Sequence, residues 1–140
     1  MKSALIVLLC VAGIAHADPT PPPRPPDDPI GERLFPPELI MSHQRELALD
    51  DKTRTVMIDD IQKFQTVVVK LQWDLRREGE ALAKLLAADR PDEGNVLAQA
   101  DKVMALERDV KRAHLGLLVR LKARLTPAQQ ATLQKVRRAP

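Results

Sequence analysis

Residues 57–85 read MIDDIQKFQTVVVKLQWDLRREGEALAKL, and this stretch decides the fold. Its large apolar residues recur at alternating steps of four and three, with one position of the series taken by Glu78: Met57, Ile61, Phe64, Val68, Leu71, Leu75, Leu82 and Leu85. This spacing is typical of a long amphipathic helix with a coiled-coil-like seam. Asp50 or Asp51 can cap its start, and the residues before Pro91 should end it, because a residue preceding proline disfavours helical angles.

The helical pattern continues on both sides of this stretch. A first short helix is expected from Pro36-Pro37 to near Leu49, and a third helix after Asp92, which can cap it. The last helix has the clearest start: Thr126 caps it, Pro127 takes its first position, and Gln129 completes a capping box. The expected fold is therefore all-α, with four helices in a domain of residues 36–140.

The N-terminal part has the form of an export signal. An apolar run from Ala4 to Ala15 follows Lys2, and small residues at 15 and 17 predict cleavage between Ala17 and Asp18. We expect a signal peptide at 1–17 and a periplasmic product, with an uncleaved anchor as the alternative. Nine of the twelve prolines lie in 19–37, which predicts an extended linker over 18–35.

The expected helix lengths constrain the assembly. A second helix of about 36 residues would be about 54 Å long, so the second and third helices should form an antiparallel hairpin. Two helices contact along one narrow line and cannot cover apolar stripes of this width, which predicts a homodimer. The alternative, a compact monomeric four-helix bundle, would need the second helix to break near Gly79.

The chain offers few groups for catalysis. The sequence has no glycine-rich phosphate loop. The low aromatic content, 2% of the residues, bears on the fold and argues against a β-sandwich. The cleaved chain has no cysteine, since Cys10 lies in the leader, and its one serine, Ser42, is adjacent to His43. Adjacent helical residues do not face each other, so we expect no enzyme. The pair Asp59-Asp60 is interpreted as a solvated helix face.

A metal site, if present, would depend on His43 and His114, with Glu46 three residues after the first histidine. Zn, Ni, Co and Cu are the candidate ions, although a structural or surface role for each histidine is the favoured interpretation. No other cofactor is expected.

Basic residues gather towards the C-terminus, with nine Lys or Arg between Arg108 and Arg138 against one acid, Asp109. Nucleic acid is not the expected partner, because an exported chain without stacking aromatics is a poor candidate. An anionic lipid surface or an acidic polypeptide fits the compartment better.

The segment Leu125-Thr126-Pro127-Ala128-Gln129, together with the layout above, resembles the periplasmic heavy-metal-resistance and envelope-stress family that includes Spy, CpxP, ZraP and CnrX. The family's hallmark is Leu-Thr-x-x-Gln, usually present twice. An earlier copy at 49–53 keeps Leu49 but has Asp50 in the threonine position and Thr53 in the glutamine position. The stretch 34–39, LFPPEL, is also similar to the metal-resistance branch.

The resemblance implies a hook-shaped helical homodimer with a concave cradle. Members bind unfolded clients, restrain a membrane-bound signalling protein, or sense nickel or cobalt through helical His, Glu and Met. The sensing pattern is incomplete here, because Leu118 stands four residues after His114, and His43 is flanked at that spacing by leucines. We therefore expect polypeptide binding, with a metal-responsive and membrane-anchored sensor as the alternative.

Overall fold

The computed structural model describes residues 28–138, so the predicted signal peptide, its cleavage between Ala17 and Asp18, and linker residues 18–27 lie outside the described part. The chain forms a short 3-10 helix and four α-helices: η1 (Gly31–Arg33), α1 (Pro37–Ser42), α2 (Asp51–Leu86), α3 (Glu93–Ala123) and α4 (Pro127–Arg138). Residues 28–138 contain no β-strand. The prediction of an all-α, four-helix fold is confirmed.

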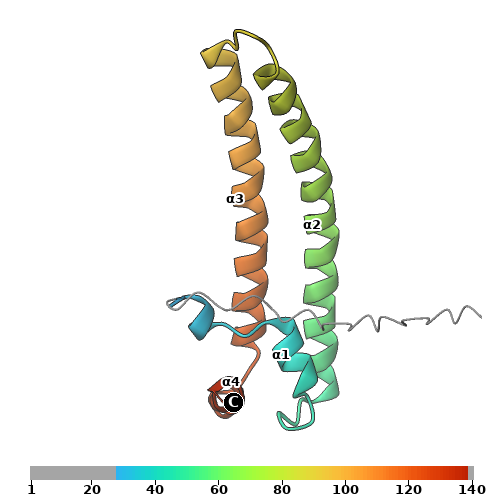
Figure 1. Ribbon diagram of the computed structural model, residues 1–140. Coiled ribbons are helices and arrows are strands. Elements are labelled where there is room, and N and C mark those ends of the chain that lie inside the picture. Colours follow the sequence, from blue (N-terminus) through green and yellow to red (C-terminus); the bar gives the residue numbers. More distant parts are fainter. Residues whose placement is uncertain (1–27, 139–140) are drawn as a thin grey trace, which may run out of the picture.

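A long antiparallel hairpin of α2 and α3 dominates the shape (Figure 1). Both caps are as predicted: the Asp50 side chain accepts a hydrogen bond from the Thr53 amide, and Asp92 accepts one from the Asn95 amide. The 36 residues of α2 run without a break through Gly79, which no other side chain approaches. The compact bundle that required a break there is therefore wrong for this chain.

The start of α4 is the predicted capping box. The Gln129 amide donates to the Thr126 hydroxyl (3.2 Å), and the Thr126 amide donates to Gln129 Oε1 (2.9 Å). Pro127 is the first helical residue. In Figure 1, α4 is seen end-on while α3 is seen from the side, so the chain turns sharply at Leu125 and gives the molecule its hook.

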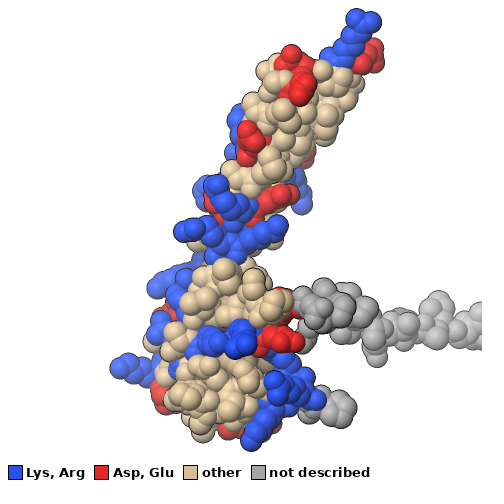
Figure 2. Space-filling view, turned by 90° about the vertical axis from the view of Figure 1, so that its left-hand side faces the viewer, with Lys and Arg blue, Asp and Glu red and all other residues tan. Residues whose placement is uncertain are grey.

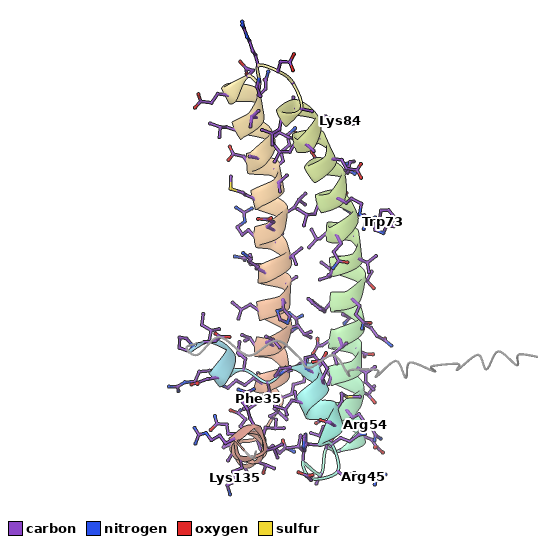
Figure 3. The ribbon with its side chains drawn as sticks, viewed as in Figure 1. Phe35, Arg45, Arg54, Trp73, Lys84 and Lys135 are labelled. Carbon is purple, nitrogen blue, oxygen red and sulfur yellow. The ribbon has the colours of Figure 1, made fainter. Side chains whose placement is uncertain are left out.

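The hydrophobic core lies at one end of the hairpin, which we call the base (residues 28–60 and 117–138). It is built from eight buried apolar side chains: Phe35, Ile40, Leu47, Met57, Leu117, Leu121, Leu125 and Leu133. Figure 3 shows Phe35 where the hairpin meets the short elements below it. Every described element except η1 contributes to this core or to the turns that border it, so the base is where the chain closes on itself.

The first helix is shorter than predicted. We expected it to run to near Leu49, but α1 ends at Ser42, and residues 43–48 form a separate turn. In this turn the Leu49 amide donates to the Gln44 carbonyl, and the Ala48 amide donates to the Arg45 carbonyl. This is the Schellman pattern, with Ala48 in the left-handed region at φ 47°. The turn places the Leu47 side chain in the core. If α1 continued as a helix, the chain would not turn back and Leu47 would lie elsewhere.

The linker boundary at residue 35 is also corrected. Residues 28–35, which we call the strap, include η1 and end in two buried side chains, Leu34 and Phe35. The strap crosses α3 near its C-terminal end before the chain enters α1 (Figure 1). An aromatic residue with no exposed surface belongs to the folded domain, which therefore begins before Pro36.

Beyond the base, the hairpin projects as an arm (residues 61–116). None of its apolar side chains is fully buried: the seam positions from Ile61 to Leu85 are at best half-buried, and the same holds for α3 from Val96 to Val110. The sequence argument that two helices cannot cover such seams is consistent with this exposure. A dimer that would cover them stays a prediction.

Candidate functional site

The outer face of α2 carries an uncharged, partly apolar stripe. Ile58, Val69 and Trp73 are exposed along it, with Gln62, Gln65, Thr66 and Gln72 between them. Trp73 is 68% exposed and points away from α3 (Figure 3). Its only ring partner among the described residues is the Arg76 guanidinium, 5.7 Å from the ring centroid. Tryptophan is enriched among the residues that contribute most to protein interfaces, so Trp73 is a candidate contact residue.

The outer face of α3 combines apolar and cationic side chains. Leu97, Met104, Leu115 and Val119 are each about half exposed, and a shallow hollow is lined by Met104, Glu107, Arg108, Lys111, Arg112 and Leu115. Figure 2 shows the corresponding band of Lys and Arg crossing the arm, with uncharged surface above and below it. Exposed apolar residues bordered by charge are typical of interaction surfaces.

The basic residues between Arg108 and Arg138 differ in their partners, and the first of them, Arg108, pairs with Asp109. Arg120 and Arg124 pair with Asp60, and Lys122 and Arg137 donate to carbonyl oxygens of the strap. Lys111, Arg112, Lys135 and Arg138 make no ion pair within residues 28–138. Within the described residues these last four side chains thus have neither a carboxylate partner nor a strap carbonyl, and contact with an anionic membrane stays a prediction.

One polar contact joins the two helices of the arm. Gln99 is the arm's only buried residue, and its amide nitrogen donates to the Glu78 carbonyl (3.0 Å) and to Glu78 Oε2 (2.9 Å). The hydrogen bond from Gln99 to the Glu78 carboxylate, followed by that from Arg77, lowers the pKa of Glu78. The pair occupies the position where the apolar series is interrupted, so it fixes the register of the arm.

The three candidate metal ligands lie on different elements. His43 follows α1, and its Nδ1 lies 3.0 Å from the Leu39 carbonyl oxygen. Glu46 is exposed on the following turn, and His114 on α3 packs against Phe64 of α2 with ring centroids 5.8 Å apart. No three His, Cys, Asp or Glu side chains gather into a possible metal site anywhere in 28–138. Within residues 28–138 the structure therefore does not bring the three candidates together, and a metal site stays a prediction.

Ser42 and His43 do meet, contrary to our prediction. The Ser42 hydroxyl lies 3.0 Å from His43 Nδ1, because both residues are at the frayed end of α1, where the helix no longer holds their side chains apart. The hydroxyl donates to the Leu39 carbonyl, which is also within 3.0 Å of His43 Nδ1. Both groups thus serve to satisfy a carbonyl at the helix end.

Asp60 is the polar residue that sequence reasoning missed. We interpreted it as solvated, but it is buried and its two carboxylate oxygens face Arg124 (3.0 Å) and Arg120 (3.5 Å) of α3. The signal available in the sequence was its position one residue before Ile61, beside the apolar seam. The pairing ties α2 to α3 where the base ends and the arm begins.

The residues of the Leu-Thr-x-x-Gln motif hold the base together. Leu125 is buried in the core, and Gln129, besides completing the capping box, donates to the Leu47 carbonyl (2.8 Å) of the turn after α1. The degenerate copy at 49–53 keeps its capping role by other means: Asp50 accepts hydrogen bonds from both the amide and the hydroxyl of Thr53. These two bonds lower the pKa of Asp50.

The described residues thus form an elongated, all-α helical hairpin with a packed base and an apolar arm. The sequence matches the family described as heavy-metal resistance over residues 2–139, and the chain belongs to that family. No curated protein and no solved structure matches the chain. Members of the family are generally non-enzymatic and typically exported to the periplasm. None of the helices within 28–138 has the length and apolarity needed to cross a membrane.

Proposed function

We propose that this chain is a non-enzymatic periplasmic protein that binds polypeptide, either unfolded clients or a membrane-bound signalling protein, on a cradle formed by two copies. The observation that carries the proposal is the arm, which exposes large apolar side chains on both helices and buries none of them fully. Burial of such surface is the main driving force of association.

The homodimer belongs to the same proposal. The seam residues of the arm are half-buried in one copy, and a second hairpin packed against them would complete their burial. The outer faces, with Trp73 on α2 and the cationic hollow on α3, would then remain for polypeptide. Sedimentation velocity on the chain from Asp18 should report a dimer, and a single globular subunit at micromolar concentration would contradict the cradle.

Suppression of aggregation tests the binding itself. At stoichiometric amounts the protein should reduce light scattering by a chemically denatured client, with or without chelator. Met104→Gln should weaken the effect, because this half-exposed thioether lies on the arm. Met41→Gln is the matched control, since Met41 is exposed at the base. No suppression at any ratio would count against the proposal.

A metal-responsive regulator is the second candidate, favoured by the family to which the chain belongs. Because no three ligands gather within 28–138, His43, Glu46 or His114 would need donors from outside these residues or from a second copy. Calorimetry with Zn, Ni, Co and Cu tests this directly. Binding that is lost on His43→Ala or His114→Ala would support it, and no heat with any of the four ions would remove it.

A further inference from the structure

The strap is held to the rest of the molecule through its backbone carbonyls. Arg137 of α4 donates to the Gly31, Glu32 and Leu34 carbonyl oxygens, the first two at 3.0 and 2.9 Å. Lys122 of α3 donates to the Arg33 carbonyl oxygen at 2.6 Å. Four consecutive carbonyls are thus bound by two cationic side chains, which recognise backbone and not the identity of the strap residues.

Only the end of the strap is anchored by side chains. Phe35 has no exposed surface, and the Arg137 guanidinium lies 5.3 Å from its ring centroid. Leu34 is also buried, whereas residues 28–30, 32 and 33 are exposed. The site occupied by the strap therefore consists of an apolar pocket, a cation above it, and donors for the preceding carbonyls.

The strap's own amides do not tie it to any helix. The Glu32, Arg33 and Leu34 amides donate to carbonyls of Asp28, Ile30 and Gly31, which are all within the strap. Its polar attachments are thus long Lys and Arg side chains. The hydrogen bonds to the Glu32 and Arg33 carbonyls are exposed, where water and salt screen them, and those to Gly31 and Leu34 are partly buried. Segments with this kind of attachment open locally without unfolding of the whole domain.

We propose that Lys122, Arg137 and the Phe35 pocket form a polypeptide-binding site that the chain's own strap occupies and that an incoming unfolded segment can take over. The ligand is a stretch of backbone with free carbonyls leading to a large apolar or aromatic side chain. That this ligand comes from a client or partner protein rests on the function proposed above. Because the strap connects the linker to the base, its opening would change how the linker is attached to the base.

Trypsin cleavage after Arg33 measures opening on the whole protein, because in the closed strap Leu34 is buried and the Arg33 carbonyl is bound by Lys122. Mass spectrometry should detect a fragment that begins at Leu34 before any cut inside α2 or α3. Arg137→Gln should accelerate this cut about tenfold, as expected for loss of charge-assisted hydrogen bonds. Arg138→Gln, which removes the same charge from the next residue, should leave the rate within about twofold.

Exchange is tested with a fluorescent peptide of residues 28–35 that carries Arg33→Gln, which removes its trypsin site. The peptide should accelerate the cut in the wild-type chain by occupying the open site, and a peptide that also carries Phe35→Ala should not. Phe35→Ala protein, checked for helicity by circular dichroism, should bind the labelled peptide directly. Adding Arg137→Gln should weaken that binding about tenfold, and adding Arg138→Gln should not.

Two results would overturn the site. One is a cut after Arg33 that occurs only with global unfolding, at the same urea concentration as cuts in the helices. The other is cleavage unaffected by peptide but accelerated by anionic phosphatidylglycerol vesicles, which would make lipid the occupant. Either result would contradict the strap site and would not affect the test of aggregation suppression. Conversely, peptide exchange at the strap without aggregation suppression would contradict only the proposed function.

Discussion

On α3, Leu121 has no exposed surface, whereas Leu97, on the same helix nearer the tip, is 55% exposed. The two residues represent the base and the arm. At the base a third layer, formed by the strap, α1 and α4, covers the hairpin, and apolar side chains are enclosed on all sides. In the arm only two helices meet, so one side of each seam faces solvent. The difference shows that the same amphipathic helix stabilises the fold at one end and leaves apolar side chains exposed at the other.

The largest expected effect comes from truncating these two leucines. Leu121→Ala should lower the free energy of unfolding by about 2–5 kcal/mol, because it leaves a cavity in the core. Leu97→Ala should change it by less than about 0.5 kcal/mol. Urea denaturation followed by circular dichroism measures both. Equal losses would mean that the arm is buried in solution, for example by a second copy.

The junction between base and arm should be sensitive to Asp60. Asp60→Asn weakens two ion pairs with half-exposed arginines that water can resolvate in part, so we expect a loss of about 1–2 kcal/mol. Asp59→Asn, on the adjacent exposed residue, should stay within about 0.5 kcal/mol. The same urea titration applies, and a similar loss for both variants would show that Asp60 acts only through the net charge of α2.

These contrasts indicate what a single sequence can predict. The helices and caps follow from neighbouring residues: Asp50 with Thr53, Asp92 with Asn95, and Thr126 with Gln129 are each three apart. The partners of Asp60 are 60 or more residues away, and which of the nine C-terminal cations would reach it depends on the register of the hairpin.

The packing of the strap was also difficult to predict, because the strap lies in a proline-rich part of the sequence. The density of prolines there is typical of a linker, and the only signal for packing was the adjacent pair Leu34-Phe35 at the end of the strap. For the metal candidates, local spacing suggested more than the structure shows. His43 and Glu46 have a ligand-like spacing, but the turn after α1 leaves Glu46 exposed, and no cluster of three donors forms within residues 28–138. Local spacing identifies elements, whereas a site depends on contacts between them.

The turn after α1 offers a smaller effect, at the base. Ala48 adopts φ 47°, which is unfavourable for a residue with a Cβ atom. Ala48→Gly should raise the free energy of unfolding by about 0.5–1 kcal/mol, since the relief of strain exceeds the added chain entropy. Ala87→Gly at the end of α2 is the matched control. Because Ala87 is right-handed at φ −74°, this variant should lose stability, and a gain there would show that the turn is not the cause.

The smallest expected effect lies in the arm and depends on pH. Hydrogen bonds from Gln99 and then Arg77 lower the pKa of Glu78 below its ordinary value of 4.5. The folded state therefore binds fewer protons at this group than the unfolded state, so its contribution is present above pH 4.5 and is lost as the pH falls through the lowered pKa. Protection factors of the amides near Glu78 and Gln99, which are exchange rates corrected for the intrinsic rate at each pH, should be lower at about pH 3.5 than at pH 5.5, while those of the base core should not change. Glu78→Gln should flatten this dependence, and Glu80→Gln, two residues along on the exposed surface, should leave it intact. Acid sensitivity of the same size at the base would mean that the hairpin opens as one unit, and the distinction between arm and base would then not extend to their stability.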